Sequence, residues 1–148
     1  MQWKPNVTVA AVAMEDDRFL MVEENSKGRI VYNQPAGHLE KNETIFDAVR
    51  REVLEETAWD FEPGGIVGMY LYTNPREKIT YLRICFAGVC TRHFPDRKLD
   101  TGIERAVWLT KEELESMKDR MRSNMVLRCI NDYLSGKLYP MDILNHFL

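Results

Sequence analysis

The stretch of residues 37–59, GHLEKNETIFDAVRREVLEETAW, most constrains what this chain can fold into. Within it Glu52, Glu55 and Glu56 follow Arg51 on one predicted helix, and at 100° per residue their carboxylates border its apolar stripe. Like charges three or four positions apart destabilise an isolated helix by roughly 0.2–0.5 kcal/mol per pair, and desolvation adds a further cost. The helix therefore needs positive charge beside these glutamates.

A divalent cation would remove this repulsion. Mg2+ binds oxygen ligands, usually one or two carboxylates together with water and substrate phosphate. Arg51 alone cannot neutralise three carboxylates. The alternative is a solvated acidic helix, which is the ordinary interpretation of Glu112, Glu113 and Glu115 further along the chain.

The spacing of these residues resembles the Nudix box, G-x5-E-x7-R-E-U-x-E-E-x-G-U, where U is a bulky apolar residue. Gly37, Glu43 and the run from Arg51 to Glu56 match it in register. One position departs, because Ala58 stands where the family has glycine. In the family that glycine ends the helix, a place where a left-handed backbone is common and alanine costs roughly 1 kcal/mol. The helix here is therefore expected to end differently or under strain.

The resemblance implies an α+β protein with the Nudix α/β/α sandwich, a mixed sheet between helices. It also implies metal-assisted attack of water on a phosphorus of a nucleoside diphosphate linked to another group, with Mg2+ as cofactor and Mn2+ as a possible substitute. By the same resemblance the metal ligands are the Gly37 carbonyl, Glu52, Glu55 and Glu56, and Arg51 orients the site. Glu52 or Glu55 would act as general base, and the sequence does not choose between them.

Three further site residues are predicted outside the box. Many Nudix enzymes take another acidic ligand from a later loop, for which Glu104 is the first choice and Asp100 the second; an exposed charge at a strand edge is the equal alternative. Tyr72 could stack a base and Arg83 could hold a phosphate. Core packing of the tyrosine and a surface ion pair of the arginine are the competing interpretations.

The segments KPNVTVAAV, VYNQPAGHLE, YLRICFAG and LSGKLYPMDIL resemble the bacterial NudJ-type phosphatases. This resemblance implies hydrolysis of nucleoside tri- and diphosphates, hydroxymethylpyrimidine pyrophosphate and thiamine pyrophosphate, with release of orthophosphate. One alternative is another Nudix substrate, such as a dinucleoside polyphosphate, ADP-ribose or a capped RNA end. The other is a Nudix module that senses a nucleotide without hydrolysis, although such modules typically lose the box glutamates.

The hydrophobic pattern predicts the order of elements along the chain. Asn42 is the expected N-cap of the box helix, Pro63-Gly64-Gly65 is expected to precede a strand, and Thr110 with Glu113 forms a capping box. The predicted strands are 6–13, 18–23, 30–33, 66–73, 79–90 and 103–109, the first two and the pair 66–73 and 79–90 forming hairpins, with helices from residue 43, from residue 111 and over 121–134. An apolar tail follows Gly136 and is expected to dock back.

Composition limits the class of protein. With 148 residues and 45% hydrophobic content, residues 1–148 can form one domain with a single core. The net charge of −3 without a basic block argues against a nucleic-acid polymer, and the three cysteines lack zinc or disulfide spacing. No apolar run of 18 residues and no signal-peptide pattern occur, so we expect a cytoplasmic protein without a membrane partner, a monomer or small homo-oligomer, acting on a small phosphate anhydride.

Overall fold

The computed structural model describes residues 2–148, which form one mixed sheet with helices on both sides. The strands are β1 (Asn6–Glu15), β2 (Arg18–Ser26), β3 (Arg29–Asn33), β4 (Ala36–His38), β5 (Trp59–Thr73), β6 (Thr80–His93) and β7 (Ile103–Thr110). The helices are α1 (Ile45–Thr57), α2 (Lys111–Ser116) and α3 (Asn124–Leu134), with 3-10 turns at Lys118–Arg120 and Met141–Ile143.

The sheet has the path β3-β2-β1-β6-β5, with β4 paired to β1 and β7 paired to β2. β1 runs parallel to β6 and antiparallel to β2 and β4, which makes the sheet mixed. The predicted hairpin of 66–73 with 79–90 is confirmed as β5 and β6. The first predicted hairpin is confirmed but short, because β1 and β2 pair only through Met14–Phe19 and Glu15–Arg18 before they diverge.

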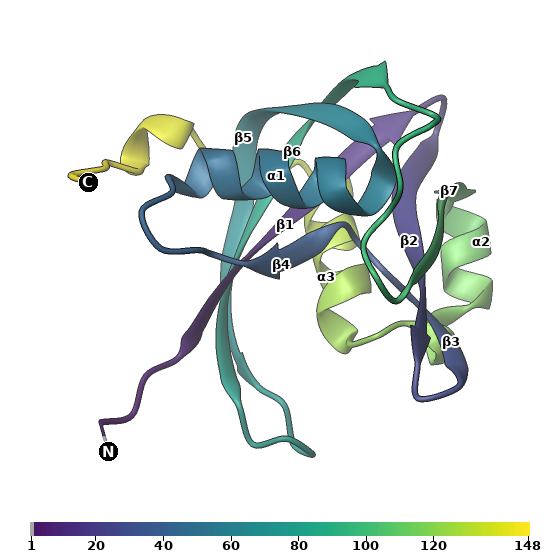
Figure 1. Cartoon of the computed structure of the whole chain (residues 1–148), viewed down its shortest axis with the longest axis horizontal. Helices are drawn as coiled ribbons and strands as arrows, with labels where there is room; N and C mark the ends of the chain where they lie inside the picture. The colour runs from purple at the N-terminus through teal and green to yellow at the C-terminus, as the bar shows by residue number, and fades with distance from the viewer. Residues whose placement is uncertain (1) are drawn as a thin grey trace.

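Alternate residues of β1 enter two separate cores. Val9 and Ala11 pack with Val49 and Val53 of α1, whereas Ala10 belongs to the core that contains α3. Figure 1 shows α1 and α3 on opposite faces of the sheet, and α2 beside β7. This alternation follows from the two-residue period of a strand buried on both faces. The α/β/α sandwich with a mixed sheet is therefore confirmed.

The box helix begins two residues later than the sequence suggested. Thr44, not Asn42, is the N-cap, and its hydroxyl accepts a hydrogen bond from the Asp47 backbone N–H at 3.0 Å. Asn42 instead adopts a left-handed turn with φ 67°. Because an N-cap residue needs an extended backbone, Asn42 cannot serve as one. Glu43 consequently precedes the helix instead of lying in its first turn.

Two further boundaries differ from the prediction. β5 starts at Trp59 and runs through Pro63-Gly64-Gly65, where shifts in its register with β6 accommodate the proline and glycines as bulges. α3 starts at Asn124, behind Ser123 as N-cap, instead of at residue 121. The capping box of Thr110 and Glu113 at the start of α2 is confirmed.

The C-terminal tail returns to the sheet and to α1. Tyr139 and Ile66 of β5 exchange backbone hydrogen bonds of 2.7 and 2.8 Å. The His146 Nε2 atom accepts a hydrogen bond of 3.2 Å from the Ile45 N–H in the first turn of α1. Within residues 2–148, no helix is long and apolar enough to cross a membrane.

Replacement of Ala58 by glycine tests the strain at the end of α1. Ala58 caps the helix in the left-handed conformation, with φ 63° and ψ 21°, and its methyl group is buried. Relief of that conformation gains about 1–2 kcal/mol, against roughly 0.8 kcal/mol for the lost methyl contact. We expect Ala58→Gly to raise the free energy of unfolding by up to about 1 kcal/mol, measured by urea denaturation. Ala48→Gly, within the helix, should lower it, and an unstabilised Ala58→Gly protein would contradict the strained cap.

Candidate active site

Three carboxylates converge at the end of α1. Oxygen atoms of Glu52, Glu55 and Asp100 all lie within 4.8 Å of one another. Asp100 comes from the loop between β6 and β7, and its backbone N–H donates a 3.0 Å hydrogen bond to the Glu55 carbonyl. Burial is the largest influence that raises the pKa of Asp100, and the negative charge of Glu55 is the second. This arrangement offers hard oxygen ligands to a divalent cation.

The acidic group from the later loop is Asp100, the second choice of the sequence analysis. Glu104, the first choice, lies exposed on β7 and is not part of the three-carboxylate group. The physical reason is the path of the loop, which bonds to α1 at Asp100 and then moves away to pair with β2. A role for Glu104 as metal ligand stays a prediction without support from this geometry.

Arg51 lies among the carboxylates and pairs with several of them. Its guanidinium donates to Glu43 at 2.7 and 3.0 Å, to Glu52 at 2.7 Å and to Glu55 at 2.9 Å. It also donates to the His38 carbonyl at 3.0 Å, which ties α1 to the end of β4. The Glu43 hydrogen bonds are the main reason that the pKa of Arg51 is raised and that of Glu43 lowered. Arg51 thus fixes the rotamers of two candidate ligands.

Gly37 lies directly against the Glu52 carboxylate. A Cβ atom at position 37 would lie 2.1–2.3 Å from the three carboxyl atoms of Glu52, so that any other residue would displace this carboxylate. Burial is the largest influence on Glu52 and raises its pKa, although Arg51 acts in the opposite direction. The close approach places the β4 backbone beside the acidic group, where the predicted Gly37 carbonyl ligand would have to be.

Glu56 is partly buried and lies close enough to Glu52 and Asp100 for their charges to act on it. Its Oε1 accepts a 2.9 Å hydrogen bond from the Ala36 N–H of β4, and no arginine or lysine pairs with it among residues 2–148. Burial raises the pKa of Glu56 to about 9, and the charges of Glu52, Glu24 and Asp100 raise it further against the effect of the Ala36 N–H. An ionised Glu56 therefore requires a cation that this fold does not itself provide.

The two residues predicted to bind substrate lie on the α3 face of the sheet. Tyr72 stacks on Tyr81, with ring centroids 5.4 Å apart, and the His38 ring lies 6.3 Å from that of Tyr81. Tyr72 is partly exposed, so the structure does not support the alternative of a core tyrosine. Arg83 is buried, at 4% exposure, and not in a surface ion pair. Among residues 2–148 its side chain donates one hydrogen bond, to Asn33 Oδ1 at 3.4 Å.

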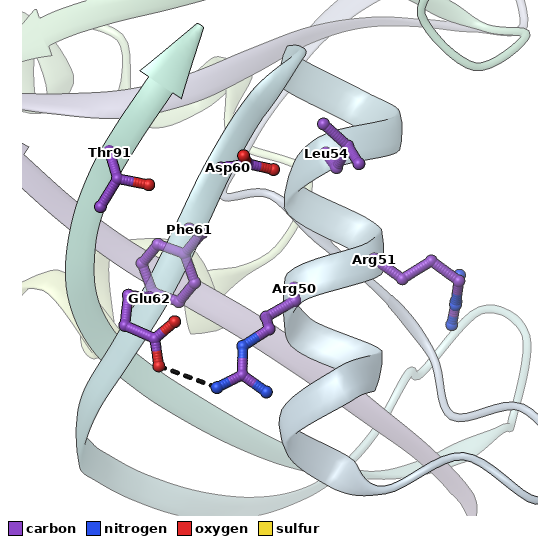
Figure 2. A pocket seen from close by; sticks show the side chains of 7 residues that line it. All are labelled: Arg50, Arg51, Leu54, Asp60, Phe61, Glu62 and Thr91. Carbon is purple, nitrogen blue, oxygen red and sulfur yellow. Dashed lines mark hydrogen bonds and ion pairs between the residues drawn. The ribbon is translucent and has the colours of Figure 1, made fainter.

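A separate cleft lies on the outer side of α1. Figure 2 shows Arg50 reaching across it to Glu62, while Arg51 points to the other side of the helix. The Arg50–Glu62 distance is 2.8 Å and both side chains are substantially exposed. Such a pair contributes little to stability. This is the one ion pair among the lining residues, and Glu52, Glu55 and Asp100 do not line the cleft.

Glu24 of β2 is a buried acid that sequence analysis did not single out. It is 8% exposed, accepts from Asn33 Nδ2 at 3.4 Å and pairs with Arg122 at 2.5 Å. No local pattern could have identified these contacts, because Glu24 and Arg122 are 98 residues apart. Glu24 shares a strand face with Leu20 and Val22, and this was the one available sequence signal of its burial.

Comparison with known proteins agrees with the fold and the box. The NUDIX domain model matches residues 4–128. The chain is 37% identical over 145 residues to Phosphatase NudJ of Escherichia coli, covering 98% of this chain and 94% of that protein. It also resembles the solved structure of a NUDIX hydrolase from Nitrosomonas europaea, with a TM-score of 0.96, 50% identity, and coverage of 97% and 98% of the two chains.

More distant structures share the fold alone. A MutT NUDIX hydrolase from Burkholderia pseudomallei has a TM-score of 0.73 at 15% identity, over 88% of this chain and 98% of that one. The chain agrees with these relatives over almost its whole length. Within it, Arg51 holds glutamates of α1 next to Gly37. This chain belongs to the NUDIX family of phosphohydrolases.

Proposed function

We propose that this enzyme is a Mg2+-dependent phosphatase of nucleoside tri- and diphosphates and of thiamine-pathway pyrophosphates, namely hydroxymethylpyrimidine pyrophosphate and thiamine pyrophosphate. The proposal on phosphate release is supported by the 37% identity to Phosphatase NudJ over 98% of this chain. The observation that carries the hydrolytic chemistry is the convergence of Glu52, Glu55 and Asp100 within 4.8 Å.

The residues at this site fit divalent cations of the Mg2+ type. The donors are all oxygens, Gly37 leaves room beside Glu52, and partly buried Glu56 lacks a cationic partner among residues 2–148. We assign the metal ligands to Glu52, Glu55 and Glu56, with Asp100 and the Gly37 carbonyl as further candidates. When bound, such cations neutralise phosphate oxygens and lower the pKa of a coordinated water.

The protein's own contribution is orientation and proton transfer. Arg51 holds Glu52 and Glu55 at 2.7 and 2.9 Å, so that their oxygens are already directed to a common point before substrate arrives. We propose that one of these two glutamates accepts the proton of the attacking water. Glu55 is the more exposed of the two, with 26% side-chain exposure against 11% for Glu52. Each remains a candidate because both could contact a water molecule.

On the α3 face, Tyr72 is proposed to contact the organic group of the substrate and Arg83 one of its phosphates. The stacked pair of Tyr72 and Tyr81 offers a flat aromatic surface that suits a pyrimidine or purine ring. His38 connects this surface to the acidic site, because it follows Gly37 directly on β4. We propose that a substrate with a ring at one end and phosphates at the other contacts both regions.

Replacement of Glu56 by glutamine tests the metal assignment. Glu56→Gln keeps the size and the acceptor for the Ala36 N–H but removes the charge, and we expect kcat/KM to fall on the order of 100-fold or more. Orthophosphate and pyrophosphate are assayed separately with Mg2+ and a panel of nucleotides, ADP-ribose, a dinucleoside polyphosphate and the two thiamine-pathway compounds. Circular dichroism checks the fold.

Glu112→Gln provides the matched control, because it removes one exposed carboxylate from α2 and should leave turnover unaltered. Near-normal turnover of Glu56→Gln would contradict the assignment of Glu56. Exclusive cleavage of ADP-ribose or the dinucleoside compound would favour the alternative pyrophosphohydrolase activity. Release of neither product from any compound would favour a nucleotide sensor.

The raised pKa of Glu56 predicts how stability depends on pH in EDTA. Its folded pKa of about 9 exceeds the usual 4.5, so the stabilisation from its neutral form is present below pH 4.5 and is lost as pH rises towards 9. Between pH 6 and 9 the parent should lose at most about 1.4 kcal/mol per pH unit from this group. We expect a smaller loss in Glu56→Gln, measured by urea denaturation. Equal pH dependence of both proteins would show that Glu56 is already ionised without metal.

A further inference from the structure

Arg83 of β6 is a buried cation without a counter-ion. It is 4% exposed, and within residues 2–148 no carboxylate lies within 4.0 Å of its guanidinium nitrogens. Its Nε atom is buried and makes no hydrogen bond. A buried charge is costly unless it is paired and fully hydrogen-bonded, so the desolvation of this guanidinium is not fully compensated.

Asn33 orients this guanidinium but cannot neutralise it. Its side-chain oxygen accepts from Arg83 Nη2 at 3.4 Å, and its Nδ2 donates to Glu24 Oε1 at 3.4 Å. The other Glu24 oxygen pairs with Arg122 at 2.5 Å. The nearest acid in this chain of contacts is thus already paired with a different arginine, and among residues 2–148 no carboxylate neutralises Arg83.

The position of Arg83 relates it to the acidic site. Thr8 of β1 pairs with His38 of β4 on one side and with Arg83 of β6 on the other, so two strand spacings, or about 10 Å, separate the backbones of His38 and Arg83. Asn33 lies three residues before Ala36, whose N–H bonds to Glu56. The guanidinium and the end of β4 are therefore neighbours across β1.

We infer that Asn33 and Glu24 position Arg83 as a metal-independent receptor for one phosphate of the substrate, distinct from the phosphate that cations hold at the acidic site. The inference rests on the proposed function for the identity of the ligand as a phosphate anhydride. Asn33 and Glu24 are positioning residues that act through Arg83. A substrate with two or more linked phosphates meets both sites, whereas a monophosphate meets only one of them.

The test is binding of inorganic pyrophosphate in EDTA, measured by calorimetry and by the shift in thermal unfolding. The parent should bind pyrophosphate and be stabilised by it, and Arg83→Met should lose both effects. Asn33→Asp places a carboxylate of the same size beside the guanidinium and should weaken pyrophosphate binding at least about tenfold, because the new charge competes with the ligand. In the Mg2+-loaded enzyme it should raise KM by a similar factor, with kcat altered less than about threefold.

Asn25→Asp is the matched control, because it adds the same charge at an exposed position of β2 and should leave binding and KM unaltered. If Arg83→Met does not fold, Asn33→Asp alone decides the question. Unchanged pyrophosphate binding in Asn33→Asp, or no binding by the parent, would overturn the inference. Arg83-dependent binding by a protein without hydrolytic activity would support the inference and refute the proposed function. Hydrolytic activity without Arg83-dependent binding would support the proposed function and refute the inference.

Discussion

The pairing of Arg51 with the carboxylates around it is the interaction on which this site depends. Without it, Glu52 and Glu55 would repel each other on the same side of α1, next to Asp100 from another element. Arg51 replaces part of that repulsion with hydrogen bonds of 2.7–2.9 Å to the two glutamates. Because it also donates to the His38 carbonyl, it fixes the end of β4 to the helix. The acidic group can therefore be assembled before any cation binds.

Arg51 does not pair with Glu56, so Glu56 differs from Glu52 and Glu55 in the charge beside it. Glu52 and Glu55 share a cationic partner, whereas Glu56 has only the Ala36 N–H, which is why burial raises its pKa to about 9. Because carboxylates bind metals in their deprotonated form, a raised glutamate pKa links metal affinity to pH. Under the proposed function, ionisation of Glu56 would therefore be coupled to metal binding.

Sequence patterns predicted what depends on local spacing. The 3.6-residue period placed Glu52, Glu55 and Glu56 at the edge of the apolar stripe. The departure at Ala58 left open a different helix end or a strained one, and the structure has the left-handed end. The N-cap prediction at Asn42 was wrong because Asn42 and Thr44 are both suitable cap residues within three positions. Of the two, Thr44 has the extended backbone that an N-cap needs. The local sequence does not show which of two suitable residues has this backbone conformation.

What could not be predicted depends on contacts between distant segments. Asp100 rather than Glu104 joins the acidic group because the loop bonds to the Glu55 carbonyl, a contact across 45 positions that no spacing encodes. The burial of Arg83 was equally hidden, since a basic residue in an amphipathic strand is usually solvated. The contact of Arg83 with Asn33 spans 50 positions.

The two uncompensated charges of this fold have opposite signs and lie near strands of one sheet. The carboxylates of Glu52, Glu55 and Asp100 come from α1 and the β6–β7 loop, whereas among residues 2–148 no carboxylate pairs with the guanidinium of Arg83 on β6. They do not neutralise each other, because β1 lies between β4, which is beside the carboxylates, and β6. Under the proposed function, a metal-bound pyrophosphate would supply charges of both signs, positive towards the carboxylates and negative towards Arg83. Complementarity of this kind favours the complete complex over metal or phosphate alone.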